Sequence, residues 1–423
     1  MMKLTVIGLL MLIIAAAIMW LLPTRSPSMQ ISSTLLQSNI EKYVDLGPHR
    51  SGGYGDQATR DWLAEELERA GFEVEIQSVP IRQWQHEEAY IAFGEARVAG
   101  FPYWWPPDTA TQRNVTGILR WIGEAGTGEI AVLQIDPHLM SALRTEQLSL
   151  IGQAADRGVI GVVLLTETIS DEPFAFNAPS TQISLPIIVV GSEATASVAQ
   201  LVDSGEPVDL KIVGAYADVQ TWNVVGRLSR KGEKTVAVST PRTGWFHCGA
   251  ERGPGVALFV ETAKWAASAG EADLVFVATG GHEISHVGMN AFMDEGAPDP
   301  DQTKLWVHLG SSIAAFDWQT HGQRLDGEPT QQNVATRWII YSGSMIFSVT
   351  KEFRRLGYEH SPAFISAFGE ARDIKDAGYP KFIAFAGSHP YFHLPSDSAA
   401  NTSGQILKPT ALALQKVMMQ HLE

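Results

Sequence analysis

The feature that most constrains the fold of this chain is a regular alternation of apolar strands and helices that begins near Asn223. The strand patterns lie at residues 224–228, 235–239, 274–278, 305–309 and 381–384, and the helical patterns lie at 255–267, 289–294 and 344–356. Strands that alternate with helices of this length are typical of an α/β sandwich with a mostly parallel central sheet. We therefore predict a three-layer α/β/α fold for this part of the chain.

Two other parts precede this alternation. An amphipathic helical pattern at residues 61–70 is followed by a strand pattern at 72–76. Short strands and turns then fill residues 90–215, with no group of Asp, Glu, His or Cys at the spacing of metal ligands. We therefore expect residues 32–89 and 216–423 to build one α/β domain, and residues 90–215 to form a β-rich domain inserted into it.

Composition excludes several classes of protein. A chain of 423 residues is long enough for two or three units with their own cores. The formal net charge of -15 argues against a nucleic-acid partner, because a phosphate backbone requires a basic surface. The single cysteine, Cys248, excludes an intrachain disulfide framework and a cysteine-rich zinc site, and we expect it to be a small buried side chain.

The N-terminal region carries a targeting pattern. Residues 4–22 are almost uninterrupted apolar side chains, close to the ~20 residues that cross a bilayer as a helix. Lys3 precedes this run and Arg25 follows it, and no clear small-residue cleavage site follows Leu22. We predict an uncleaved signal anchor at residues 1–25, with a cleaved signal peptide as the alternative. Either interpretation places the bulk of the chain outside the cytoplasm, and the anchor would make the membrane a partner.

The residues best suited to catalysis or metal binding follow the ends of the predicted strands. They are Glu251, Glu283, His308 and His393, and each follows or ends a different strand pattern. In open α/β sheets, sites collect in the loops beyond the carboxyl ends of the strands. We therefore expect these four side chains to lie near one another.

The segment His282-Glu283-x-x-His286 can be interpreted in two ways. Alone, it matches the zincin motif, in which two histidines one helical turn apart bind zinc and the glutamate is the base. That motif requires a continuous helix, whereas here a strand pattern ends at Thr279, two glycines follow, and Gly288 comes soon after. We therefore expect Glu283 to be the functional carboxylate and His286 to begin a helix, either at the surface or beside the metal ligands without binding the metal. The zincin interpretation stays as a lesser alternative.

Three segments carry a resemblance to a known family. Residues 249–257 contain an acidic residue before a glycine-rich helix start, 274–288 contain a strand followed by Glu283 and a glycine turn, and 391–397 contain His-x-Pro-x-Asp. In this order the chain resembles the zinc exopeptidase family of the di-zinc aminopeptidases and the glutaminyl cyclases. Residues 90–215 also resemble the protease-associated domain that several members carry as an insertion. The resemblance implies the three-layer zinc-exopeptidase fold.

The same resemblance implies a metal site. It places Glu251, Glu283 and His393 as ligands of Zn²⁺. Thr240, or a neighbour within one residue, stands where the family has its first metal-binding histidine, and His308 stands where it has the aspartate of the second metal. One zinc ion per chain is therefore expected. Two carboxylates and one imidazole with an open fourth position suit a catalytic zinc ion.

The expected activity follows from this ligand set. A single zinc ion polarises a carbonyl or lowers the pKa of bound water. His282 stands where the family has its catalytic glutamate, and a neutral imidazole beside a cation can accept a proton. The resemblance thus implies zinc-dependent hydrolysis of a peptide or amide bond, as in an aminopeptidase, with His282 as the acid–base residue. Cyclase-type acyl transfer at a peptide N-terminus is a less favoured variant.

Other polar residues near these segments have weaker roles. His308 and His247 are further possible ligands or neighbours of the ligands. Tyr391, His389 and Arg252 are expected to line the substrate pocket. The sequence gives no indication of the oligomeric state.

A protein without catalytic activity would show the same substitutions. The alternative function is therefore a binding or scaffold protein on the peptidase fold. The two can be distinguished by geometry, because an enzyme requires the heads of Glu251, Glu283 and His393 to converge below an open pocket. If Arg252 or bulky side chains fill that space, the binding function is favoured.

Overall fold

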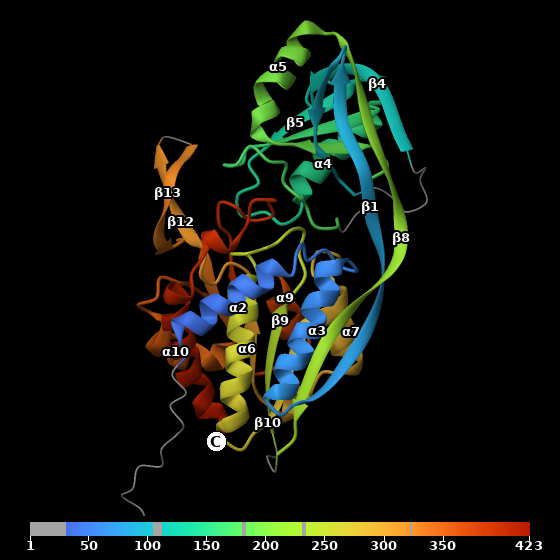
Figure 1. Ribbon diagram of the computed structural model, residues 1–423. Coiled ribbons are helices and arrows are strands. Elements are labelled where there is room, and N and C mark those ends of the chain that lie inside the picture. The colour runs from blue at the N-terminus through green and yellow to red at the C-terminus, as the bar shows by residue number, and fades with distance from the viewer. Residues whose placement is uncertain (1–30, 105–111, 180–182, 231–233, 322–323) are drawn as a thin grey trace, which may run out of the picture. The chain divides into compact units, whose positions relative to one another are not determined.

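The computed structural model describes residues 31–104, 112–179, 183–230, 234–321 and 324–423 (Figure 1). The signal anchor predicted at residues 1–25 lies outside these ranges. Within them, no helix has both the length and the apolar character that crossing a bilayer requires. The domain described below begins at Ile31, the first residue of the compact unit that extends to Glu423.

The central sheet has a parallel middle and antiparallel flanks. Its strands follow the order β15-β14-β16-β11-β9-β10-β8. The parallel strands are β16 (Phe382–Gly387), β11 (Thr303–Leu309), β9 (Thr235–Pro241) and β10 (Asp273–Thr279). The antiparallel flanks are β14 (Arg337–Tyr341) and β8 (Pro207–Leu228), and β15 (Glu359–Pro362) pairs parallel to β14. The predicted mostly parallel central sheet is confirmed.

Helices cover both faces of this sheet because successive side chains of each strand point to opposite sides. Phe276 of β10 packs against Phe259 of α6, with ring centroids 5.3 Å apart. Its neighbours Val275 and Val277 pack in a separate cluster with Phe292 of α7. The strands are therefore buried on both faces, as expected for parallel strands between helical layers. The predicted three-layer α/β/α arrangement is confirmed.

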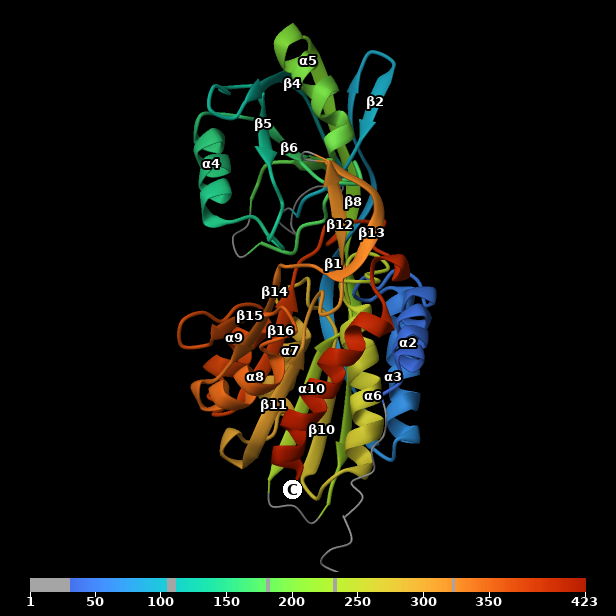
Figure 2. The ribbon, with the colours of Figure 1, turned by 90° about the vertical axis from the view of Figure 1, so that its left-hand side faces the viewer.

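The helices divide between these faces (Figure 2). One layer contains α2 (Ser33–Asp45), α3 (Tyr54–Arg69), α6 (Gly253–Ser268), α8 (Ile346–Phe353) and α10 (Gly404–Leu422). The other layer contains α7 (Val287–Glu295) and α9 (Glu370–Asp376). Short turns of 3-10 helix are η1 (Ser192–Ala194), η2 (Pro300–Gln302), η3 (Gly343–Met345) and η4 (Ala399–Asn401).

A second group of strands continues from the far side of β8. Its order is β8-β4-β5-β6-β7-β3, in which β4 to β7 run parallel. The elements are β2 (Ala96–Ala99), β3 (Phe101–Pro102), β4 (Gln112–Trp121), β5 (Ile130–Ile135), β6 (Gly161–Thr166), β7 (Ile187–Val190), α4 (Thr145–Asp156) and α5 (Thr195–Ser204). Every residue of β6 is buried, because this strand lies at the centre of an apolar cluster of its own.

Two long strands belong to both groups. β1 (Glu73–Phe93) pairs antiparallel with β8 from Glu73 opposite Arg227 to Ala92 opposite Asp209 (Figure 1). The ladder has one irregularity, between His86 and Glu88. The boundaries expected at residues 89/90 and 215/216 therefore fall inside these two strands.

The sequence patterns missed some elements. The hairpin of β12 (Phe316–His321) and β13 (Arg324–Asn333), the strands β14 and β15, and the helix α9 had no recognised pattern. α9 has seven residues, which is too short for an amphipathic period to show. This omission matters because α9 contributes to the site described next.

Candidate functional site

A pocket of about 430 Å³ lies at the carboxyl edge of the parallel strands, where sites of such sheets collect. Ser311 and Ser388, which follow β11 and β16, lie in its wall. Its apolar wall contains Leu139, Met140, Trp338, Phe368, Phe385 and Phe392. Its polar wall contains Arg252, His282, His286, His308 and Glu370. Of the four residues expected to gather at the strand ends, the wall of this pocket contains His308.

The loop before α6 positions Glu251. A side chain at Gly249 would place its Cβ 2.1 Å from the carbonyl carbon of Ser398, so only glycine allows this approach. The backbone N–H groups of Ala250 and Glu251 donate to the carboxylate of Asp397 at 2.9 and 3.0 Å. These contacts fix the carboxyl group of Glu251 inside the protein.

Glu251 is 1% exposed and lies between two basic side chains. Its Oε1 is 3.0 Å from Nη2 of Arg252 and 3.6 Å from Nε2 of His393. Burial raises the pKa of Glu251, but the charges of Arg252 and His393 outweigh it, so the pKa is lowered. Glu251 and His393 are therefore brought together as the sequence predicts, with Arg252 as an additional partner.

His393 is oriented by the segment between β6 and β7. Its Nδ1 lies 2.6 Å from the carbonyl oxygen of Ala175, which requires the proton on Nδ1. Its ring stacks between Phe174 and Phe392, with centroid distances of 5.2 and 4.2 Å. Nε2 is thereby directed to Glu251.

Glu283 is held by hydrogen bonds from two loops. Its Oε1 accepts from the N–H and the hydroxyl of Ser51 at 3.0 and 2.6 Å, and its Oε2 accepts from the hydroxyl of Thr243 at 2.9 Å. Charge-assisted hydrogen bonds of this kind fix a carboxylate firmly. In the described part of the chain, no three His, Cys, Asp or Glu side chains are arranged so that they could hold a metal ion. The residues therefore do not fit the zinc ion that Glu251, Glu283 and His393 were expected to bind.

His282 and His286 form a stacked pair in the pocket wall. Their ring centroids lie 4.7 Å apart. Nδ1 of His282 is 2.8 Å from Glu370, and Nδ1 of His286 is 2.8 Å from Asp373. Each imidazole is thus backed by one carboxylate from α9, an arrangement that fixes the orientation of the ring.

The two imidazoles differ in pKa. Burial, followed by the charges of Arg252 and His286, lowers the pKa of His282 well below its ordinary value. Burial also lowers the pKa of His286, but the hydrogen bond to Asp373 and the charge of Glu370 outweigh it, so that pKa is raised. At neutral pH, His282 is therefore a neutral base, and His286 binds a proton more readily than an ordinary histidine.

Of the two positions expected for His286, at the surface or beside the metal ligands, the structure rules out a place at the surface apart from the site. The residue lines the pocket and contacts Asp373. The helix start was anticipated, since α7 begins at Val287 with His286 as its N-cap at φ 58°. His282 lies in the preceding turn, so the backbone is not the continuous helix that the zincin motif requires.

The other predicted residues divide between the pocket and its surroundings. His308 lies in the wall, with Nδ1 3.0 Å from the hydroxyl of Ser239 and 3.6 Å from Glu370. Burial is the largest cause that lowers its pKa. Arg252 lines the pocket as expected, whereas His247, His389 and Tyr391 are not in its wall.

For two of these residues, His389 and Tyr391, contacts with other side chains explain why they are not in the pocket wall. Nδ1 of His389 contacts the hydroxyl of Ser312 at 2.9 Å, and its Nε2 lies 3.3 Å from Asp397. The ring of Tyr391 packs edge-on against Trp318, with centroids 5.1 Å apart. These side chains join loops behind or beside the pocket.

Sequence reasoning missed Glu370 and Asp373. Two carboxylates three residues apart share one face of a helix, so their spacing was readable. The helix itself could not be predicted, because α9 is short and polar. The partners of Glu283 were also missed, since Ser51 lies 232 positions away along the chain.

Comparison with known proteins identifies the fold. No family model matches the chain. No curated protein matches it either. Among solved structures, it is similar to an aminopeptidase from Aneurinibacillus sp. strain AM-1, with 14% identity, coverage of 94% of this chain and 95% of the other, and a TM-score of 0.65.

Two further structures agree. A zinc aminopeptidase from Bacillus subtilis has 13% identity, coverage of 93% and 95%, and a TM-score of 0.71. A peptidase M28 precursor from Shewanella amazonensis SB2B has 14% identity, coverage of 93% and 94%, and a TM-score of 0.66. These likenesses extend over nearly the whole of each chain, so this protein has the fold of the zinc aminopeptidases.

Proposed function

We propose that this protein binds the amino-terminal end of a peptide in its pocket and does not hydrolyse it by zinc chemistry. The observation that carries the proposal is the engagement of the expected metal ligands by protein groups. Arg252 pairs with Glu251, and Ser51 and Thr243 donate to Glu283. The peptide is inferred from the fold, since the similar structures are aminopeptidases.

The chemistry of the pocket supports an amine with an apolar neighbour. Its volume of about 430 Å³ accommodates a small ligand, and the rings of Phe368, Phe385 and Phe392 offer an apolar surface. On the polar wall, the charge of Arg252 is matched by Glu251, which leaves the carboxylate of Glu370 to attract a cation. An ammonium group can pair with a carboxylate and lie over an aromatic face.

The proposal predicts selective binding of a free amino terminus. A tripeptide that begins with leucine should bind at least about tenfold more tightly than its N-acetylated form, which corresponds to about 1.4 kcal/mol for one lost ionic contact. Isothermal titration calorimetry measures both affinities, and chromatography of the same samples measures cleavage. Equal binding of the two peptides, or their cleavage on addition of zinc, would contradict the proposal.

The binding should weaken in acid. Because the pKa of His286 lies above the ordinary value of 6.5, this residue takes up a proton as the pH falls through that raised pKa. Protonated His286 then compensates Asp373 and Glu370 and repels an ammonium group. We expect the affinity for the free tripeptide to fall by about tenfold, which corresponds to about 1.4 kcal/mol of lost attraction. Titrations from pH 8 to pH 5 test this, and H286Q should remove most of the dependence.

A second candidate function is zinc-dependent hydrolysis of a peptide or amide bond. The specific observation in its favour is the proximity of Glu251 and His393, at 3.6 Å, in a buried position. Among the described residues, neither carboxylate oxygen of Glu251 has a hydrogen-bond partner. Zinc-stimulated release of nitroaniline from leucine p-nitroanilide, lost in E251Q, would establish this activity over the first proposal.

A further inference from the structure

We propose that the guanidinium of Arg252 is the resident cation of this site and takes the place that a metal ion would occupy beside Glu251. The inference goes beyond peptide binding. It concerns how the site stays folded, and it holds or fails whether or not a peptide binds.

The carboxylate of Glu251 requires a positive partner. It is 1% exposed, and within the described residues no hydrogen bond reaches either oxygen. Removal of a carboxylate from water without a compensating charge is strongly unfavourable. Arg252 is 2% exposed, and its Nη2 lies 3.0 Å from Oε1 of Glu251.

The protein holds this guanidinium in a fixed position. Nε of Arg252 donates to the carbonyl oxygen of Thr243 at 3.1 Å, and the backbone N–H of Arg252 donates to that of Cys248 at 2.9 Å. The hydroxyl of the same Thr243 donates to Glu283 at 2.9 Å. Thr243 thus connects the arginine to the second of the expected ligands.

The position of the charge also disfavours a metal ion. Arg252 faces the same pocket as His282 and His308, and it lowers the pKa of both after the larger effect of burial. A divalent ion at Glu251 would lie beside a fixed positive charge, and repulsion at about 4 Å in a protein is substantial. The carboxylate and the guanidinium therefore compensate each other's charge as a buried ion pair.

The test uses the full chain purified without chelator. We expect zinc content by elemental analysis to be far below one per chain, and EDTA to leave the urea midpoint unchanged. R252M should shift the folding equilibrium by roughly a hundredfold or more toward the unfolded state, because it takes the guanidinium away from a buried carboxylate. E251Q/R252M should recover most of this loss and stay free of zinc.

Arg337 offers a matched control. It is 2% exposed, and its side chain donates to the carbonyl oxygens of Val334, Ile313 and Leu356. R337M should also be destabilised, but E251Q should not recover that loss. This difference distinguishes stability that is regained by removing the charge of Glu251 from a general stabilising effect of E251Q.

Three results would overturn the proposal. They are about one zinc per chain whose removal lowers the midpoint, no loss of stability in R252M, and no recovery in the double variant. Binding of zinc by R252M alone would support it, since the cation would then have been replaced. If R252M does not fold, a folded and zinc-free E251Q/R252M still supports the proposal, and an unfolded double variant contradicts it.

Discussion

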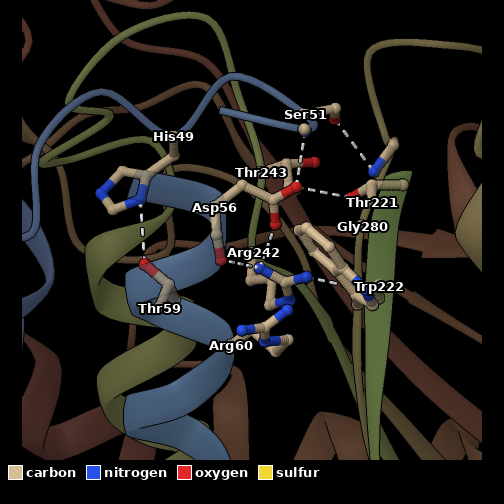
Figure 3. Close-up of polar contacts among 12 residues, drawn as sticks. His49, Ser51, Asp56, Thr59, Arg60, Thr221, Trp222, Arg242, Thr243 and Gly280 are labelled. Carbon is tan, nitrogen blue, oxygen red and sulfur yellow. Dashed lines mark hydrogen bonds and ion pairs between the residues drawn. The ribbon is translucent and has the colours of Figure 1, made fainter. Parts of the chain in front are cut away.

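Replacement of Arg242 by methionine is expected to destabilise the protein by about 3–5 kcal/mol, the cost of breaking a buried ion pair from one side. Arg242, the residue after β9, and Asp56 of α3 are both fully buried and form an ion pair. The guanidinium also donates to the carbonyl oxygens of Asp56 and Trp222 (Figure 3). Without it, the carboxylate of Asp56 would remain buried without its cationic partner.

The effect should reach the candidate site, because Asp56 also accepts hydrogen bonds from Gly52 and Thr221, each at 2.7 Å. Gly52 follows Ser51, which holds Glu283. Unfolding in urea, followed by circular dichroism, measures the loss of stability.

A control for this variant is available in the same region. Arg60 lies over the ring of Trp222, 4.3 Å from its centroid, and also pairs with Asp61. R60M should cost less than about 1 kcal/mol, the range of exposed ion pairs. Similar losses in R60M and R242M would show that the buried pair has no special contribution.

The second large effect is expected for E283A, which should destabilise the protein by about 3 kcal/mol or more whether or not zinc is present. The substitution removes the acceptor of three hydrogen bonds, and the N–H and hydroxyl of Ser51 and the hydroxyl of Thr243 are left in the interior. Each unsatisfied buried group costs about 1–3 kcal/mol, and these costs are not strictly additive.

Urea unfolding with and without zinc tests this prediction. E65A is a suitable control, because Glu65 is exposed and pairs with Arg69 within one helix. E65A should lose about 0.5 kcal/mol of stability. A loss in E283A that appears only when zinc is supplied would show that Glu283 is a metal ligand.

The sheet could be predicted because its strands carry a strong local pattern. Residues 274–278 are apolar on both faces, and so are 305–309 apart from His308, as expected for parallel strands between two helical layers. The helix α6 was recognisable for a related reason, because its apolar helical pattern follows a glycine-rich segment. The fold class followed from these segments alone.

The long strands could not be predicted in the same way. β1 spans Glu73–Phe93, includes Pro80, and mixes polar and apolar side chains without strict alternation. Its ladder with β8 depends on a partner more than a hundred positions away along the chain, which no local pattern reveals. The sequence therefore indicated only the first residues of this strand.

The candidate site was predicted in part. Glu251 and His393 were placed together by the order of their segments, and the structure brings them to 3.6 Å. The role of Glu283 was not predictable, because its partners come from the loop at Ser51 and from Thr243. The charge of Arg252 beside Glu251 was visible in the sequence, but its direction toward that carboxylate was not.

The continuous pairing of β1 and β8 has a consequence for cooperativity. An inserted domain attached through two flexible loops can open while the rest of the protein remains folded. Here both connections are strands whose hydrogen bonds extend from one sheet into the other. If the hydrogen bonds between β1 and β8 break at one end of the ladder, the next residue pair along the two strands loses the paired neighbour that holds it in register. The histidine that Ala175 orients, His393, is consequently coupled to the integrity of the whole ladder.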